Sequence, residues 1–338
     1  MISLQSRDIG LKEKPFIIAE MSGNHNGSLD RAIALVDAAA EAGADAVKLQ
    51  TYTADTLTLD VKSDAFVISD PGSLWYGKSL YELYSEASTP WEWHADIMTH
   101  AAKRGLICFS SPFDTSAVDF LESLGVGAYK IASAEVIDHA LIQYVAETGK
   151  PIIISTGMAT LSEIAEAVAV CHSVGNKNIA LLQCTASYPA SPENSNILTI
   201  PNMRETFGCE VGLSDHTMGV GAAVGAVALG ATIIEKHFTL RRSDGGIDSA
   251  FSLEPSELAQ LVVETERANL ALGSVAYGPT ESETFGRMYR RSLYVSEDIK
   301  EGETFSKSNV RSVRPGFGLH PKYLGMVLGR QAKCALLK

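Results

Sequence analysis

Polar side chains that could do chemistry recur at the ends of short apolar runs in this sequence. These residues are Glu20; Lys48 and Gln50; Ser110 and Ser111; Lys130 and Ser133; Ser155 and Thr156; Thr185; Ser214, Asp215 and His216; and Glu235, Lys236 and His237. A buried strand should be apolar throughout, because each unpaired polar group inside a sheet costs on the order of 1 to 3 kcal/mol. The repeated placement therefore indicates one shared site where the strands end.

Two lysines and four serines in this set predict a pocket for an anion. Lysine brings a positive charge and a hydroxyl brings a hydrogen-bond donor, and both suit phosphate and carboxylate groups. The residues are Lys48, Lys130, Ser111, Ser133, Ser155 and Ser214. The chain has a formal net charge of −12, which repels an anion at long range. An anion pocket therefore requires several of the protein's lysines or arginines to lie close together.

Two histidines, His216 and His237, follow consecutive apolar runs and predict a site for a divalent ion. A single buried histidine more often makes only a hydrogen bond in the core, so two histidines alone are weak evidence. The carboxylates Glu20 and Asp248 fall at the same predicted rim, and this combination favours a metal site.

The elements that must position these residues are eight apolar runs that alternate with segments of helical period. The runs are Pro15–Glu20, Asp45–Thr51, Leu106–Ser111, Ala128–Ser133, Pro151–Thr156, Ile179–Cys184, Val211–His216 and Thr232–Phe238. Thr160 and Glu163 match a capping box, which predicts that a helix begins there. Eight such units predict an α/β fold of the (β/α)₈ TIM-barrel type, since a doubly wound sheet more often has about five or six strands. In such a barrel the strand ends meet at the C-terminal rim, where active sites lie.

A long insertion and a small C-terminal region complete the predicted organisation. The insertion, Tyr52–Thr89, carries Trp75 and several tyrosines, and a functional loop and a plain packing role are both open. We expect a catalytic barrel domain at residues 1–278, a polar linker at 279–291 and a small domain at 292–338. So short a domain has a marginal core of its own, so we expect it to dock on another surface.

Composition excludes several classes of protein. The net charge disfavours binding to nucleic acid or to an anionic membrane. The five cysteines are odd in number and contain no CxxC pair, which argues against a disulfide framework or a zinc ribbon and favours a reducing cytoplasm. Neither a secretory signal nor an apolar stretch long enough for a membrane-spanning helix is expected.

Seven short motifs, in order along the chain, resemble the signatures of the sialic acid synthase family. The motifs are Phe16–Glu20 with Asn24–Asn26, Ala44–Gln50, Ser111–Phe113, Tyr129–Ile131, Ser155–Met158, Gly212–Thr217 and Glu235–Thr239. The segment Arg311–Gly318 resembles part of the antifreeze-protein-like (SAF) domain that ends members of this family. The resemblance covers the whole chain, and each barrel motif falls on a predicted strand end.

The resemblance implies an enzyme that condenses phosphoenolpyruvate with an acetamido sugar to give a nine-carbon acid. Phosphoenolpyruvate would bind to the lysines and serines of the anion pocket, and the sugar and metal-bound water would face Glu20, Gln50, Glu135, Tyr188 and Asp248. The catalytic residues would be Glu20, Asp248, His216 and His237, with manganese or a similar divalent ion held by His216 and His237.

The family also implies a homodimer in which the small domain reaches across to the partner's barrel. At the matching position, Arg314 would enter the sugar site of the partner. Docking of this kind would also explain how so small a domain stays folded.

Within the family, the sequence looks most like the pseudaminic acid synthases, whose sugar is 2,4-diacetamido-2,4,6-trideoxy-L-altrose. Neuraminate synthases usually carry an asparagine after Cys-Thr at the end of the sixth strand, and this chain has Ala186 there. The segments Trp91–His94 and Asp248–Pro255 also match the pseudaminic acid synthases better. An N-acetylneuraminate or legionaminate synthase acting on a different acetamido sugar remains the alternative.

Two other classes of function stay open at this point. A non-catalytic carbohydrate-binding or ice-binding scaffold is suggested by the C-terminal domain alone. A barrel lyase that works through a lysine Schiff base would use Lys130 or Lys236.

Overall fold

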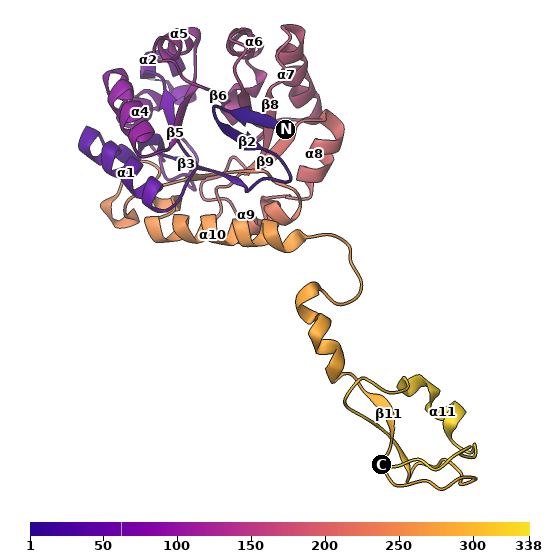
Figure 1. Ribbon diagram of the computed structural model, residues 1–338. Coiled ribbons are helices and arrows are strands. Elements are labelled where there is room, and N and C mark those ends of the chain that lie inside the picture. Colours follow the sequence, from indigo (N-terminus) through magenta and orange to yellow (C-terminus); the bar gives the residue numbers. More distant parts are fainter. Residues whose placement is uncertain (62) are drawn as a thin grey trace. The chain divides into compact units, whose positions relative to one another are not determined.

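Eight parallel strands close into a barrel in the computed structural model, which describes residues 1–61 and 63–338 (Figure 1). The strands are β3 (Phe16–Glu20), β4 (Ala46–Thr51), β5 (Ile107–Pro112), β6 (Tyr129–Ile131), β7 (Ile152–Ser155), β8 (Ile179–Cys184), β9 (Glu210–Ser214) and β10 (Ile233–His237). Strand β10 pairs with β3, with His237 opposite Glu20, and this pairing closes the barrel. All eight predicted strands are present, so the predicted TIM barrel is confirmed.

Eight principal helices follow the strands and form the outer layer of the barrel (Figure 1). They are α1 (Leu29–Glu41), α4 (His94–Lys103), α5 (Thr115–Ser123), α6 (His139–Glu147), α7 (Leu161–Ser173), α8 (Thr199–Phe207), α9 (Gly221–Ala228) and α10 (Pro255–Leu272). Helix α7 begins with the predicted capping box, in which the Thr160 hydroxyl accepts from the Glu163 amide and the Glu163 carboxylate accepts from the Thr160 amide. Each exchange satisfies an amide that the first helical turn leaves unpaired.

Shorter elements lie in the connections. They are η1 (Ser22–His25), α2 (Ala54–Leu57), η2 (Asp64–Phe66), α3 (Leu80–Ala87), η3 (Trp91–Trp93), η4 (Ser133–Ile137), η5 (Pro192–Asn194), η6 (Arg242–Asp244) and η7 (Ser249–Phe251). Three of them, α2, η2 and α3, belong to the insertion between β4 and α4.

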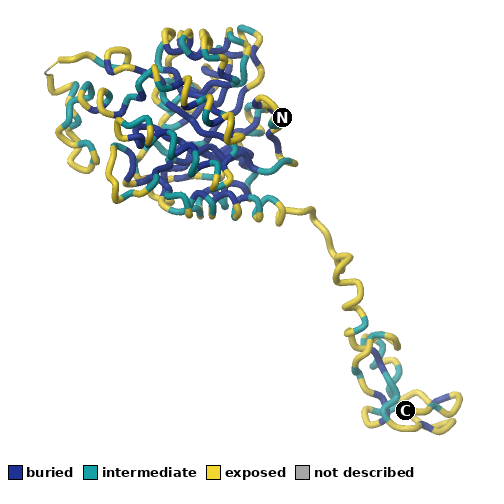
Figure 2. Tube along the Cα trace, turned by 60° about the vertical axis from the view of Figure 1, so that its left-hand side comes forward, coloured by how far each residue is buried: buried dark blue, intermediate teal, exposed yellow. Residues whose placement is uncertain are grey.

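Alternate residues of the strands belong to two separate apolar cores. Ile17 and Val47 face outward and pack with the helices, whereas Phe16, Ile18 and Phe109 face inward. Successive side chains of a strand point to opposite faces, so the inward set continues at every second residue up each strand. Figure 2 shows that the buried residues are concentrated in the interior of the barrel.

A hairpin that the sequence pattern did not reveal contributes to the inner core. Strands β1 (Ile2–Leu4) and β2 (Arg7–Ile9) pair antiparallel, and Ile2, Leu4 and Ile9 pack with the inward side chains Phe16 and Ile18. Each strand has only three residues, which is too few for the alternation to stand out in the sequence. Since the hairpin shares the core of the barrel's inward apolar residues, it belongs to the barrel unit.

The chain divides into two compact units, Met1–Gly273 and Ser274–Lys338. In the second, β11 (Ser292–Val295) pairs antiparallel with β12 (Val310–Val313), and η9 (Pro321–Tyr323) and α11 (Leu324–Val327) follow. The core of this unit is small, as expected, and is formed by Leu293, Ile299, Val310 and Ala332. Its first part holds the helix η8 (Glu281–Tyr289), within the stretch expected to be a linker. The domain limits at 278, 291 and 338 stay a prediction.

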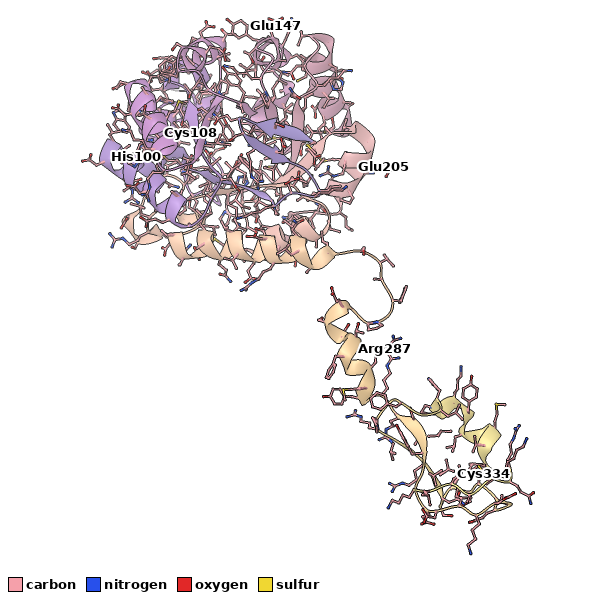
Figure 3. All side chains as sticks on the ribbon, viewed as in Figure 1. His100, Cys108, Glu147, Glu205, Arg287 and Cys334 are labelled. Atoms are coloured by element: carbon pink, nitrogen blue, oxygen red, sulfur yellow. The ribbon has the colours of Figure 1, made fainter. Side chains whose placement is uncertain are left out.

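The five cysteines are free thiols, which agrees with the expectation that no disulfide framework is present. Cys108 belongs to the barrel and Cys334 to the C-terminal unit, and both are labelled in Figure 3. Within the residues that the structure describes, no helix is both long and apolar enough to cross a membrane.

Candidate active site

The inward face of each strand changes from apolar to polar toward its C-terminal end. On β3 the inward residues are Phe16, Ile18 and then Glu20, because they share the same two-residue register. The same rule brings together the residues that line one small cavity of about 60 Å³, among them Glu20, Lys48, Lys130, Ser155, Cys184, Ser214, His216, Glu235 and His237. Seven of the eight strands supply residues at or next to their C-terminal ends to this lining. The eighth strand, β5, adjoins it through Ser111, whose Oγ lies 3.3 Å from Lys48 Nζ.

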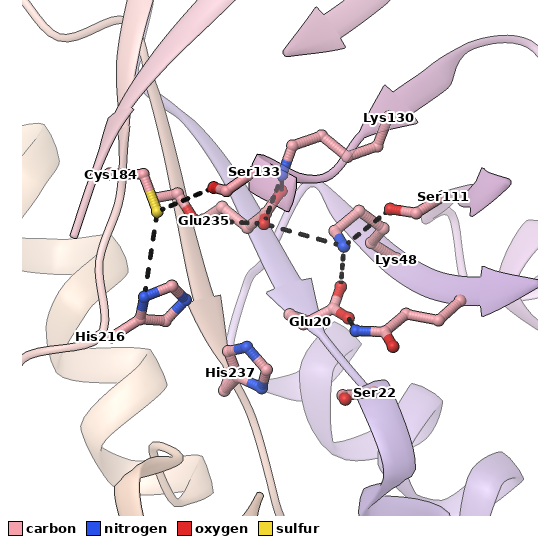
Figure 4. A network of polar contacts seen from close by, with 12 residues as sticks. Glu20, Ser22, Lys48, Ser111, Lys130, Ser133, Cys184, His216, Glu235 and His237 are labelled. Atoms are coloured by element: carbon pink, nitrogen blue, oxygen red, sulfur yellow. Dashed lines mark hydrogen bonds and ion pairs between the residues drawn. The ribbon is translucent and has the colours of Figure 1, made fainter. Parts of the chain in front are cut away.

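Two lysines and two carboxylates form the centre of this cavity (Figure 4). Lys48 Nζ lies 2.5 Å from Glu20 Oε2, 3.3 Å from Ser111 Oγ and 3.8 Å from Glu235 Oε1. Lys130 Nζ donates to both oxygens of Glu235, at 2.7 and 2.9 Å. Both lysines thus converge on Glu235, and the structure keeps them in one environment.

Burial and the attraction between opposite charges shift the pKa values of these lysines and carboxylates in opposite directions. Burial raises the pKa of Glu20 and lowers that of Lys130. Burial also acts against the charged forms of Glu235 and Lys48, but Lys130 and Lys48 lower the pKa of Glu235, and Glu20 and Glu235 raise that of Lys48. The Lys130–Glu235 pair is therefore held as a buried ion pair whose charges depend on each other.

The two histidines lie side by side at the edge of the same cavity. The ring centroids of His216 and His237 are 5.3 Å apart. The Nδ1 atom of His216 lies 2.9 Å from the carbonyl oxygen of Thr185, which leaves its Nε2 as the nitrogen with a free lone pair. Nδ1 of His237 is buried and lacks a hydrogen-bond partner within the described part of the chain, and it lies 3.7 Å from Asp248 Oδ2.

The histidine pair has the donor chemistry of a divalent-metal site. Burial lowers the pKa of His237 well below its usual range, so this imidazole stays neutral and keeps a lone pair for a metal. Burial acts in the same direction on His216, but Cys184 beside it raises the pKa, so protons would compete with a metal there. Across residues 1–61 and 63–338, no group of three or more His, Cys, Asp or Glu side chains is arranged to hold a metal. The two imidazoles are the groups of this cavity that could hold such an ion.

A second, larger cavity of about 320 Å³ adjoins the first and shares Gln50, Ala132, Ser133 and Tyr188 with it. Its other side chains are mainly aromatic or aliphatic, namely Tyr52, Leu57, Tyr84, Phe113, Ala134, Met158 and Ala186, with Glu135 as the charged group. The insertion supplies Tyr52, Leu57 and Tyr84. The insertion thus lines the site, in agreement with the functional alternative for this loop.

Most residues predicted for the site lie in these two cavities. Asp248 lies beside them, where its carboxylate accepts a hydrogen bond from the Ser22 hydroxyl. Arg314, an exposed residue that follows β12, belongs to the C-terminal unit. The assignments to phosphoenolpyruvate, sugar and metal stay predictions.

Two contributors were missed as site residues in the sequence, Glu235 and Cys184. Glu235 stands two residues before His237 on β10, so the inward alternation could have identified it. The sulfur of Cys184 lies 4.0 Å from Nδ1 of His216, and it accepts a hydrogen bond from the Ser133 hydroxyl. Only the three-dimensional approach of β8 and β9 reveals that contact.

Lys236, one of the two lysines considered for a Schiff base, does not line either cavity. Its ammonium donates to Asp215 Oδ2 at 2.8 Å and to the carbonyl oxygens of Thr217 and Gly219. The alternation that places Glu235 and His237 inside the barrel places Lys236 outside. Lys236 therefore supports the loop that follows β9 and is not available to a substrate.

The sequence matches the model of the NeuB family over residues 35–277 and that of the SAF domain over residues 290–338. The chain belongs to the NeuB family, and the resemblance to sialic acid synthases is confirmed.

Two relatives of this chain carry the name of one particular synthase. Pseudaminic acid synthase of Campylobacter jejuni is 46% identical, over 97% of this chain and 95% of that protein. Pseudaminic acid synthase of Helicobacter pylori is 44% identical, over 95% of this chain and 94% of that protein. Among solved structures, N-acetylneuraminic acid synthetase of Leptospira borgpetersenii in complex with citrate aligns with a TM-score of 0.76 at 34% identity, over 86% of this chain and 95% of that one.

Glu135 gives the larger cavity a testable pH dependence. Burial raises the pKa of its carboxyl to about 7, and its Oε2 has no hydrogen-bond partner among the described residues. The folded protein therefore binds this proton more tightly than the unfolded chain, and the resulting stabilisation is lost as the pH rises through the folded pKa. Relative to Glu135→Gln, the wild type should lose up to about 3 kcal/mol of unfolding free energy between about pH 5 and pH 8.

Urea denaturation at several pH values measures this difference. The matched control is Glu193→Gln, which changes an exposed carboxylate and keeps Glu135, so its unfolding free energy should follow the same pH dependence as that of the wild type. A difference between wild type and Glu135→Gln that stays constant with pH would contradict the assignment of a raised pKa to Glu135.

Proposed function

We propose that the chain is a pseudaminic acid synthase, which condenses phosphoenolpyruvate with 2,4-diacetamido-2,4,6-trideoxy-L-altrose and releases phosphate. The observation that carries the proposal is the buried Lys48 and Lys130 pair in a cavity that adjoins both a histidine pair and a larger, mainly apolar cavity. The two relatives that bear this name support it at 44 to 46% identity over nearly the full chain.

Phosphoenolpyruvate fits the smaller cavity by charge. Its phosphate and carboxylate would replace or join the carboxylates that now neutralise Lys48 and Lys130. Ser155, whose buried hydroxyl has no partner in the described part of the chain, would donate to the same anion, together with Ser133 and Ser214 of the cavity wall. Ser111, which adjoins the cavity through Lys48, would join them.

The larger cavity suits a sugar with few hydroxyl groups. Leu57, Phe113, Met158 and Ala186 give it an apolar wall that matches a 6-methyl group and the methyl groups of two acetamido substituents. Gln50, Glu135 and Tyr188 supply the polar contacts that would orient the sugar. A 6-hydroxylated sugar would place a polar group against the apolar wall without a partner, which disfavours the neuraminate alternative.

The bond changes follow from the two substrates. C3 of phosphoenolpyruvate attacks the aldehyde carbon of the open-chain sugar, a water adds at C2, and the resulting tetrahedral centre expels phosphate by cleavage of its C2–O bond. Glu20 and Asp248 would carry the protons, and burial, which raises the pKa of both carboxyls, supports this role. Gln50 and Lys48 hold Glu20, and Ser22 holds Asp248.

The product assay tests the proposal directly. Purified protein with phosphoenolpyruvate, Mn²⁺ and the 2,4-diacetamido-6-deoxy altrose should release phosphate and yield an acid with the mass of pseudaminic acid. N-acetylmannosamine and the legionaminate precursor, offered in parallel, should react at least tenfold more slowly in kcat/KM. N-acetylmannosamine would place a hydroxyl group against the apolar wall, and the legionaminate precursor would present its groups with a different stereochemistry. Faster reaction of either of these sugars would transfer the assignment to that sugar.

We propose that His216 and His237 hold a divalent metal ion, and that manganese is the preferred ion. Both imidazoles have a nitrogen free for coordination, and His237 is kept neutral by burial. When bound, the ion would supply Lewis-acid polarisation of the sugar's aldehyde oxygen.

Removal of the metal or of one ligand tests this assignment. EDTA should abolish phosphate release, and Mn²⁺ should restore it, while His237→Ala should lower both activity and the manganese bound per chain by at least tenfold. His172→Ala, which removes an exposed histidine of α7, is the matched control. Full activity in excess EDTA with no bound metal would refute the metal role.

We propose a homodimer in which the C-terminal unit of one chain completes the sugar site of the other, with Arg314 as the contact. The support lies in the small core of this unit and in exposed apolar side chains at both places that would meet. These are Leu74, Ile137, Met158, Leu198 and Met218 in the barrel loops, and Tyr277, Phe285 and Phe317 in the C-terminal unit. We also propose a cytoplasmic location, which the free cysteines support because disulfides are rare in a reducing compartment.

Mixed dimers test the exchange. Arg314→Ala should raise the KM for sugar about tenfold or more without changing that for phosphoenolpyruvate, because an arginine contact to substrate is lost. Arg311→Ala, an exposed arginine on β12, is the control. At a sugar concentration well below KM, where Arg314→Ala alone is nearly inactive, coexpression of Arg314→Ala with His237→Ala should give about a quarter of wild-type activity, since half the dimers would contain one intact site. No recovery, or a monomeric mass by light scattering, would contradict the exchange.

A further inference from the structure

The insertion between β4 and α4 contains a turn, before α3, that contacts the loop carrying Asp248. Backbone hydrogen bonds from Ile68 N to Lys78 O (3.0 Å) and from Gly77 N to Ile68 O (2.9 Å) close this turn. At its tip, Leu74 and Tyr76 are exposed, whereas Trp75 between them is partly buried. Trp75 is thus the tip residue that turns toward the barrel.

Trp75 makes two contacts with residues of the proposed sugar site. Its indole Nε1 donates to the backbone carbonyl of Ile247 at 3.0 Å, directly before Asp248. Its ring centroid lies 5.9 Å from that of Tyr188, which in turn lies 4.5 Å from His216. One side chain of the insertion therefore reaches both Tyr188 and the peptide that leads into Asp248.

The loop that Trp75 contacts contains two glycines, and its internal hydrogen bonds include those from Ser249 Oγ to the Gly246 carbonyl (3.3 Å) and from Ser252 Oγ to the Asp248 carbonyl (2.6 Å). Gly245 and Gly246 have φ angles of +71° and +122°, where side-chain-bearing residues are rarely found. Asn26 restrains the first of them by donating to its carbonyl at 3.1 Å. The Trp75 hydrogen bond restrains the next part of the loop, at Ile247.

Asp248 needs this restraint because it must face two groups at once. Its carboxylate accepts a hydrogen bond from Ser22 and lies 3.7 Å from His237 Nδ1. A small rotation of the Ile247–Asp248 peptide would move the carboxylate away from both, and the polar contacts of a site are sensitive to shifts of this size.

We propose that Trp75 is a positioning residue, which fixes the loop at Ile247 and so holds Asp248 and Tyr188 in place for the sugar. The kinetic part of this inference rests on the proposed function, and the structural part does not. Trp75→Phe removes the N–H donor and keeps an aromatic ring against Tyr188, while Trp75→Ala removes both. Tyr76→Phe, a change at the exposed neighbour, is the matched control.

Two measurements test the proposal. In hydrogen–deuterium exchange, Trp75→Phe should speed exchange of the amides of residues 245–249 at least threefold, with the barrel strands and the melting temperature unchanged. In steady-state kinetics, kcat/KM for the sugar should fall about fivefold, the effect of one neutral hydrogen bond. The KM for phosphoenolpyruvate should stay unchanged. Trp75→Ala should show a larger effect in both assays.

The outcomes separate the inference from the proposed function. Exchange at residues 245–249 equal to wild type in both Trp75 variants would overturn the positioning role, whatever the activity. Equal losses for both substrates together with a lower melting temperature would also overturn it, because they would indicate a general structural role. If the wild type turned over none of the sugars offered, the proposed function would fail, and the exchange result would still decide the role of Trp75.

Discussion

Two lysines buried against two carboxylates, at the polar end of a closed barrel, are the interaction on which the rest of the site depends. Lys130 and Glu235 are both nearly inaccessible to solvent, and each depends on the other for its charge. Breaking such a pair from one side leaves an uncompensated buried charge, which is far more costly than replacing the pair as a whole. The pair therefore keeps both side chains together at the wall of the small cavity, inside a strongly acidic protein.

The outward face of β9 and β10 supports the inward face. Lys236 and Asp215 form a second buried ion pair outside the barrel, and Lys236 also binds two carbonyl groups of the loop after His216. Adjacent residues of one strand thus divide the work: Glu235 and His237 face the cavity, while Lys236 fixes the backbone that presents His216. The insertion adds a similar support on the other side of the cavity, through Trp75 and the loop of Asp248. Chemistry at the rim therefore depends on residues that never enter the cavities.

Much of the fold and part of the site could be predicted because their signals are local. Each strand is a short apolar run with a polar end, so the eight strands and the rim residues Glu20, Lys48, Lys130 and His237 are visible in the sequence. The hairpin of Ile2–Leu4 and Arg7–Ile9 was missed because three-residue strands give no clear alternation. Glu235 was recognised as a polar strand end but not as a member of the site, since a carboxylate looks out of place in an anion pocket until its two lysine partners are known.

By itself, the sequence determined the order and type of the elements, the family, and the residue types that collect at the barrel rim. It did so because hydrophobic periodicity and motif order are properties of neighbouring residues in the chain. The tertiary structure alone decided which lysine shares which carboxylate, that Lys236 faces outward, that Cys184 touches His216, and that Trp75 reaches Ile247 from 172 positions away. These contacts join residues far apart in sequence, and their distances are fixed only when the barrel closes and sets the register of every strand against its neighbours.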